Sequence, residues 1–135
     1  MGYLSSINGR IDIDPPLNAA EYRTLIGGPD FGSVKVETNE TSRDTDDGTL
    51  LVLTGTAIVP AWDDDMKAYE FVANVKGAVA TLAEIGTGRR LNGVLVRAGE
   101  DQGDVERVRV VDNVCHVEMA SLTWPDGANV DMAEF

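Results

Sequence analysis

The only cysteine and the only histidine of the chain, Cys115 and His116, are neighbours in the sequence. They lie in residues 99–119, a segment that also carries an acidic turn and two arginines. A cysteine and a histidine whose side chains meet can act as a nucleophile and its general base, or as two ligands of one metal ion. The elements that position these side chains therefore decide whether the segment is an active site.

Alternating runs of apolar and polar residues surround Asp112 and Asn113, and both residue types tolerate the positive φ angles of a tight hairpin turn. Counting outward from this turn gives the predicted cross-strand pairs Val111–Val114, Val110–Cys115, Arg109–His116, Val108–Val117, Arg107–Glu118 and Glu106–Met119. Because successive side chains of a strand alternate between faces, Cys115 points toward the core and His116 points away from it. This placement excludes a cysteine–histidine dyad and a metal site shared by the two residues. The outer face of the hairpin then carries Arg107, Arg109, His116 and Glu118.

A second group of chemically interesting residues is the aspartates of the polar segment NETSRDTDDG, residues 39–48. With Asp44 at position 1 of a calcium-binding loop, the required glycine comes one place early, and Gly55 stands where a bidentate glutamate is needed. The EF-hand interpretation therefore fails. The segment is predicted to be a polar loop with a mobile tip, with an irregular cation site as the alternative. No catalytic, cofactor-binding or metal-ligating residue is predicted anywhere in the chain.

Composition limits the classes of function. With 135 residues, of which 43% are hydrophobic, the chain is expected to fold as a single domain over 1–135, with a ragged C-terminal tail at 126–135. One cysteine and no apolar leader predict a cytoplasmic protein without membrane attachment. The 23 acidic and 11 basic residues give a net charge of −12, which argues against direct binding to nucleic acid.

The same charge raises the alternative that the chain imitates a nucleic acid and occupies a basic groove. The carboxylates that would form such a surface are Asp44, Asp46, Asp47, Asp63, Asp64, Asp65, Glu100, Asp101 and Asp104. The competing interpretation is that net charge only keeps the protein soluble.

The remaining elements follow from periodicity and from turn residues. Strands are predicted over 3–13, 34–38, 49–59 and 91–97, in addition to the hairpin strands. A short helix begins after Asn18, which forms a capping box with Glu21, and a long helix over 64–85 begins with three aspartates. The order β-α-β-β-α-β-β-β predicts an α+β fold with two layers: a mainly antiparallel sheet of about six strands, with the long helix packed on one face.

The pattern as a whole resembles a family of small, acidic, uncharacterised proteins of actinobacteria and their phages. The matching segments are GRIDIDPPLNAAEY near the start and GEDQGDVERVRVVDN with TWPDG near the end. The matching residues near the end are Gly103, Asp104, Arg107, Asp112, Asn113, Trp124 and Pro125. Asn113 stands where that family usually has glycine, and Val105 where an aromatic residue is common. The resemblance implies a small α+β domain without an established activity and a phage or phage-derived origin.

The leading hypothesis is a non-enzymatic interaction protein, a phage-encoded accessory factor that binds a bacterial host protein for host takeover or anti-defence. The candidate partner-binding residues are Arg107, Arg109, His116, Glu118, Asp44, Asp46, Asp47, Glu100, Asp101 and Asp104. The alternatives are the nucleic-acid mimic and a small-molecule-binding domain or enzyme with a pocket between helix and sheet. Self-association through an exposed sheet edge is left open.

Overall fold

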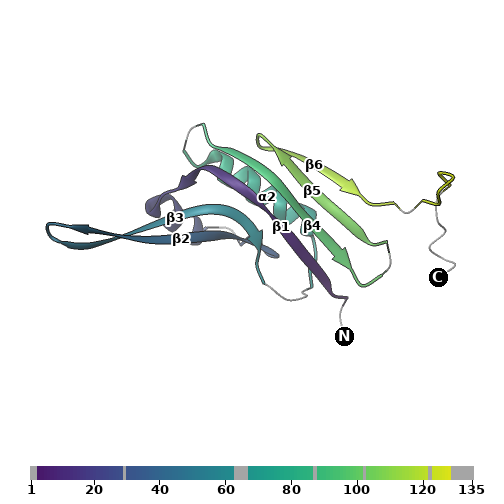
Figure 1. The fold of residues 1–135 in the computed structure, drawn as a ribbon, viewed down its shortest axis with the longest axis horizontal. Coiled ribbons are helices and arrows are strands. Elements are labelled where there is room, and N and C mark those ends of the chain that lie inside the picture. The colour runs from purple at the N-terminus through teal and green to yellow at the C-terminus, as the bar shows by residue number, and fades with distance from the viewer. Residues whose placement is uncertain are drawn as a thin grey trace.

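In the computed structural model of the chain, the described residues form one antiparallel sheet of six strands, in the order β2-β3-β1-β4-β5-β6, and two helices (Figure 1). The structure describes residues 3–28, 30–62, 67–86, 88–101, 103–121 and 123–128. The elements are β1 (Ser5–Leu17), α1 (Ala19–Ile26), β2 (Val34–Thr45), β3 (Gly48–Pro60), α2 (Phe71–Glu84), β4 (Arg90–Gly99), β5 (Val105–Val111) and β6 (Val114–Met119). The predicted α+β class and element order are confirmed.

β1 lies at the centre of the sheet, between β3 and β4. Both neighbours run antiparallel to β1, so α2 connects two parallel strands by crossing over β1. In Figure 1 this helix lies behind the sheet, where Phe71, Val75 and Leu82 pack against Ile11 and Leu95 in the core. The alternate side chains of the strands point to the other face, which no helix covers among the described residues; we call it the helix-free face.

The helix α2 is shorter than the sequence predicts, because it spans Phe71–Glu84 rather than 64–85. Glu70 occupies its N-cap in the left-handed conformation, with φ 57°, and no described side chain caps the helix at this end. A left-handed residue cannot continue an α-helix toward the N-terminus, so the helix starts after it. Asp63, Asp64 and Asp65, predicted to open the helix, lie outside the described residues.

The polar stretch 39–48 is not a loop, because it forms most of a long hairpin between β2 and β3. The strand pairing continues to Thr45 and Gly48, which leaves only Asp46 and Asp47 in the turn. Figure 1 shows this ribbon extending beyond the rest of the sheet. Every side chain from 37 to 51 is exposed. A ribbon that is solvated on both faces lacks the apolar–polar alternation by which strands are predicted.

A bulge next to Gly55 shifts the β2–β3 register, which pairs Glu37 with Ala57 and Thr38 with Gly55. The predicted capping box of α1 is confirmed. The Asn18 side chain accepts a hydrogen bond from the backbone N–H of Glu21, and the Glu21 carboxylate accepts one from the backbone N–H of Asn18.

The C-terminal segment 126–135 is predicted to be a ragged tail. Its residues 126–128 belong to a turn, and 129–135 lie outside the described residues.

Candidate interaction site

The β5–β6 hairpin has the register that the sequence predicts, from Glu106 opposite Met119 to Val111 opposite Val114. Asp112 and Asn113 form its turn with φ values of 44° and 73°. Cys115 lies on the core side, where burial raises the pKa of its thiol. His116 lies on the helix-free face and is exposed. The two side chains therefore point to opposite faces of the sheet and cannot act together.

Arg107, Arg109 and Glu118 meet on the helix-free face. The Nε atoms of both arginines lie 3.1 Å from Oε1 of Glu118. The guanidinium of Arg107, and then that of Arg109, hold the pKa of the Glu118 carboxyl below its ordinary value. The three side chains are 40–49% exposed, so solvent screens these ion pairs and leaves them available to a partner.

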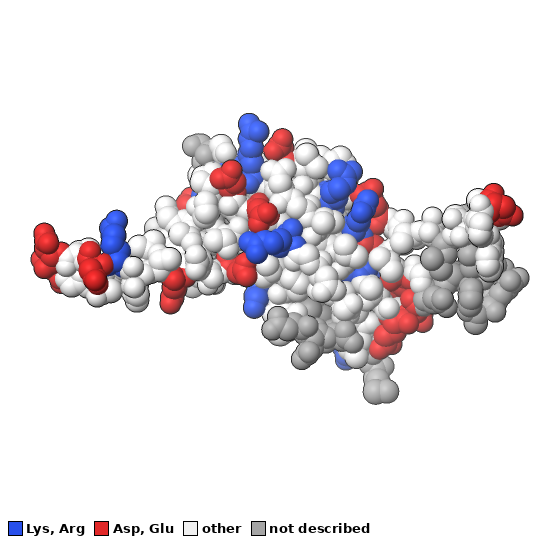
Figure 2. Space-filling view, viewed as in Figure 1, with Lys and Arg blue, Asp and Glu red and all other residues white. Residues whose placement is uncertain are grey.

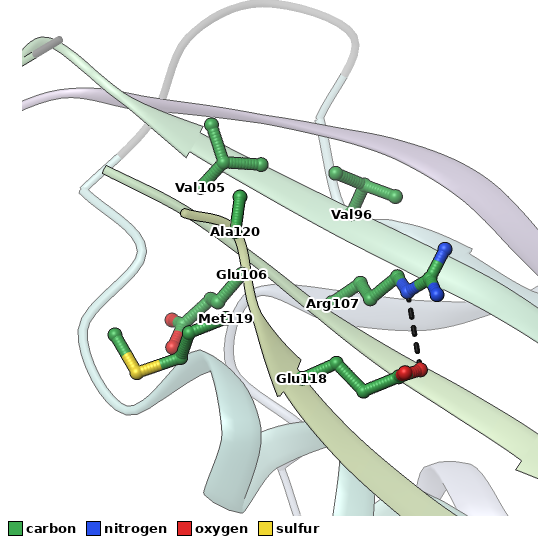
Figure 3. Close-up of a pocket in the computed structure, with 7 residues that line it drawn as sticks. All are labelled: Val96, Val105, Glu106, Arg107, Glu118, Met119 and Ala120. Atoms are coloured by element: carbon green, nitrogen blue, oxygen red, sulfur yellow. Dashed lines mark hydrogen bonds and ion pairs between the residues drawn. The ribbon is translucent and has the colours of Figure 1, made fainter. Parts of the chain in front are cut away.

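A pocket of about 330 Å³ lies beside the Arg107–Glu118 pair (Figure 3). Its apolar lining comes from Val96 on β4, Val105 on β5 and Met119 at the end of β6. Burying Met119 would require contact with another molecule, because its side chain is 75% exposed. The pocket is also lined by the carboxylates of Glu106 and Glu118, and both already accept hydrogen bonds from arginine side chains of the chain itself.

The acidic candidates that the structure describes do not gather into one surface. Asp44, Asp46 and Asp47 lie at the tip of the β2–β3 hairpin, whereas Glu100 and Asp101 lie in the connection between β4 and β5. Figure 2 shows red side chains at the far end of the hairpin and again near the β4–β5 connection, with blue and red side chains interspersed between the two groups. This separation differs from the continuous line of negative charge that a duplex presents.

Asp104, the remaining acidic candidate, is engaged in a polar network around Arg97. The Arg97 guanidinium donates to both carboxylate oxygens of Asp104, to Oε1 of Glu106 at 2.7 Å and to the hydroxyl of Ser5 at 3.0 Å. The Tyr3 hydroxyl also donates to Asp104. Arg97 and then Tyr3 hold the pKa of the Asp104 carboxyl below its ordinary value. Asp104 is therefore a structural residue rather than a free docking group.

Sequence reasoning missed Arg97, although a signal for it exists. Arg97 shares the core-facing side of β4 with Leu91 and Leu95, and a charged residue in such a position requires buried ionic partners. Between this network and the start of α2 lies a shallow groove of about 620 Å³, lined by Tyr3, Tyr69 and others. It is the place where a helix–sheet ligand pocket is predicted. The Arg97 guanidinium lines this groove, but it already donates hydrogen bonds to the carboxylates of Asp104 and Glu106.

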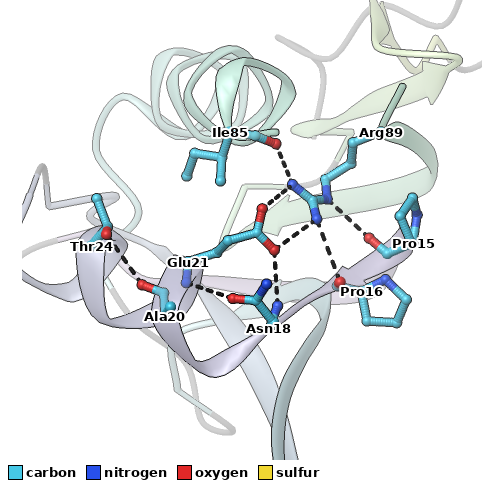
Figure 4. A network of polar contacts seen from close by, with 8 residues as sticks. All are labelled: Pro15, Pro16, Asn18, Ala20, Glu21, Thr24, Ile85 and Arg89. Atoms are coloured by element: carbon cyan, nitrogen blue, oxygen red, sulfur yellow. Dashed lines mark hydrogen bonds and ion pairs between the residues drawn. The ribbon is translucent and has the colours of Figure 1, made fainter. Parts of the chain in front are cut away.

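A second missed arginine, Arg89, connects three elements (Figure 4). Its guanidinium donates to the backbone carbonyls of Pro15 and Pro16, to that of Ile85 at the end of α2, and to the carboxylate of Glu21. Hydrogen bonding from the Asn18 backbone, and then from Arg89, lowers the pKa of Glu21. Arg89 thus joins the end of α2 to β1 and to the start of α1, which is a structural role.

The described residues thus define a small α+β domain with an open sheet face, a free edge strand and a protruding β-ribbon. Within them no group of three histidine, cysteine or acidic side chains is arranged to hold a metal ion. No described helix is long and apolar enough to cross a membrane.

The chain belongs to DUF6205, a family of unknown function, which matches residues 1–133. The resemblance to an uncharacterised family is confirmed to this extent. No curated protein and no solved structure shows significant similarity to the chain.

Proposed function

We propose that this protein is a non-enzymatic interaction module that docks a partner protein through the ribbon formed by residues 39–54, the β2–β3 arm. The observation that carries this proposal is the position of two leucines. Leu50 and Leu51 are 44% and 69% exposed, and both lie in the arm, away from the core cluster. Val52 and Leu53 continue the apolar run with partly exposed side chains.

Such a run is costly in an isolated ribbon. A two-stranded hairpin without a packed face is only marginally stable in water, and exposed leucines add nothing to its stability. Leu51 lies opposite Ser42 and Leu50 lies opposite Arg43, so alternation places the two leucines on opposite faces of the arm. A partner that receives the arm in a groove would bury both leucines at once.

The charge of the arm indicates the chemistry of that groove. Glu40, Asp44, Asp46 and Asp47 surround the leucines, and Arg43 is the arm's one basic residue. An apolar groove with a basic rim complements this pattern, because opposite charges steer the encounter while the leucines supply contact area. The separation of the two acidic groups favours such a local contact over the nucleic-acid mimic. In keeping with the resemblance to actinobacterial and phage proteins, the proposed partner is a bacterial host protein.

The test is affinity capture from an actinobacterial lysate with the tagged full-length chain. The informative variant is Leu50→Ser combined with Leu51→Ser. The matched control is Ile26→Ser, because Ile26 is 65% exposed on α1 and lies outside the arm. We expect wild type and control to retain one protein in stoichiometric amount, and the arm variant to bind it at least tenfold more weakly in titrations with the purified protein. Equal binding by the arm variant, or no protein retained by wild type, would contradict the proposal.

A further inference from the structure

The strand β6 forms one edge of the sheet, and among the described residues nothing pairs with its outer side. Natural proteins usually protect such edges with lysine, proline or a bulge. The sequence of β6, VCHVEM, contains neither lysine nor proline. Val114, Val117 and Met119 are 57%, 42% and 75% exposed. This edge is therefore open to a further strand, in both its backbone and its side chains.

The hydrogen bonds to β5 reveal which backbone groups of β6 face outward. The amide of Ala120 donates to the Val105 carbonyl at 2.9 Å, so position 120 points toward β5. In an antiparallel ladder the direction alternates along the strand, and positions 114, 116 and 118 share this orientation. Cys115, Val117 and Met119 therefore direct their N–H and C=O groups to the free edge.

We propose that β6 of a second copy of this chain pairs with this edge, antiparallel, about a twofold axis at Val117. In this register Val117 lies opposite its own copy, and Cys115 lies opposite Met119 of the second copy. All three outward residues of each copy then form hydrogen-bonded pairs. A register centred on His116 or Glu118 leaves one of the three without a strand partner and places two identical polar side chains opposite each other.

The side chains also match in the register centred on Val117. On the helix-free face His116 lies opposite Glu118 of the second copy, and the symmetry creates this pair twice. An imidazole N–H can donate to the carboxylate, which Arg107 and Arg109 bind from its own copy. On the core side the facing residues are valine with valine and cysteine with methionine, so apolar surface continues across the junction.

The dimer would join two six-stranded sheets into one of twelve strands. β2 forms the opposite edge of the sheet, so the two arms would lie at the far ends and stay free. The proposal is thus independent of the function proposed for the arm. One short strand per copy buries less than the about 800 Å² per partner of a standard interface, so we expect a dimer that forms at micromolar concentration.

Sedimentation equilibrium and disulfide cross-linking together test the proposal. We expect the mass of the wild-type chain to rise toward that of a dimer between about 1 and 200 µM, and Val117→Lys to weaken the dimer at least tenfold while the circular dichroism spectrum stays unchanged. Met119→Cys places a thiol opposite Cys115 of the second copy, and oxidised glutathione should convert it to a covalent dimer. Within one copy the two thiols lie about 13 Å apart, too far for a disulfide.

The matched control is Val114→Cys, which adds an exposed thiol to the same strand but on the helix-free face. We expect this variant to form little covalent dimer. A wild-type chain that stays monomeric over the whole concentration range would overturn the proposal. So would equal cross-linking of the Met119→Cys and Val114→Cys variants, because it would show that the strands meet without the proposed register.

Discussion

Replacing Arg97 by methionine tests whether the buried ionic network stabilises the fold. The Arg97 side chain is 11% exposed, and the carboxylates it binds, Asp104 and Glu106, are 31% and 19% exposed. Removing the cation from a buried ion pair costs about 3–5 kcal/mol, because the remaining charge is left without a partner. Water can reach both carboxylates in part, so we expect the lower value of about 2–3 kcal/mol. This corresponds to a fall of about 8–10 °C in the melting temperature of a chain of this size.

The same substitution at Arg107 provides the control. Arg107 also binds a glutamate on the neighbouring strand, but its side chain is 49% exposed, so Arg107→Met should change stability little. Urea denaturation followed by far-ultraviolet circular dichroism is the appropriate assay, because Trp62 and Trp124 are exposed and report poorly on core packing. If the two variants lost the same stability, the Arg97 network would not contribute what its burial implies.

The pH dependence of the Arg97→Met effect gives a second criterion. The folded state holds the pKa of Asp104 below its ordinary value, so the unfolded chain binds more protons as the pH falls. The contribution of Asp104 is therefore present above about pH 4 and is lost as the pH falls through the lower folded-state pKa. The difference in unfolding free energy between wild type and Arg97→Met should shrink between about pH 6 and pH 2.5. A constant difference would refute the electrostatic explanation.

Four further predictions concern the backbone and the arm. Gly93 has a φ of 152°, and a Cβ there would lie 2.2 Å from a β1 carbonyl oxygen, so Gly93→Ala should cost about 3 kcal/mol or prevent folding. Gly77→Ala, in an open position of α2, should instead stabilise by about 0.5–1 kcal/mol in urea denaturation. Asn113→Gly keeps the turn but removes an amide bonded to the backbone around the start of β4, so calorimetry should show a loss of about 1–2 kcal/mol. Replacing residues 40–53 by an Asn-Gly turn should move the melting temperature by less than about 3 °C, because the arm lies outside the core.

Local signals predicted the elements in which neighbouring residues suffice to fix the conformation. The Asp112–Asn113 turn and the strict alternation around it determined the register of β5 with β6, and Asn18 with Glu21 determined the start of α1. The start of α2 could not be predicted in this way, because the left-handed conformation of Glu70 has no signal in a residue type that favours helices.

The arm and the Arg97 network were missed for a related reason. Residues 39–45 have the composition of a loop and become a strand because β3 supplies their backbone hydrogen bonds. Arginine is usually a surface residue, so its type alone does not predict that Arg97 is buried. Its partners Asp104 and Glu106 come close to it only because the chain reverses direction between β4 and β5. Contacts between strands decide both features, and a pattern read along one segment does not contain those contacts.

The distribution of ion pairs shows where along the chain the net charge of −12 is concentrated. Within the part of the chain that the structure describes, six arginines form ion pairs with carboxylates outside the arm: Arg10, Arg89, Arg90, Arg97, Arg107 and Arg109. The arm instead combines four carboxylates with Arg43, so its tip carries an acidic excess at the end of a protruding ribbon. Screening by salt acts on such long-range attraction and hardly on the burial of leucine. Raising the salt concentration should therefore slow association with a basic partner more than it speeds dissociation, whereas the leucine variant of the arm should mainly speed dissociation.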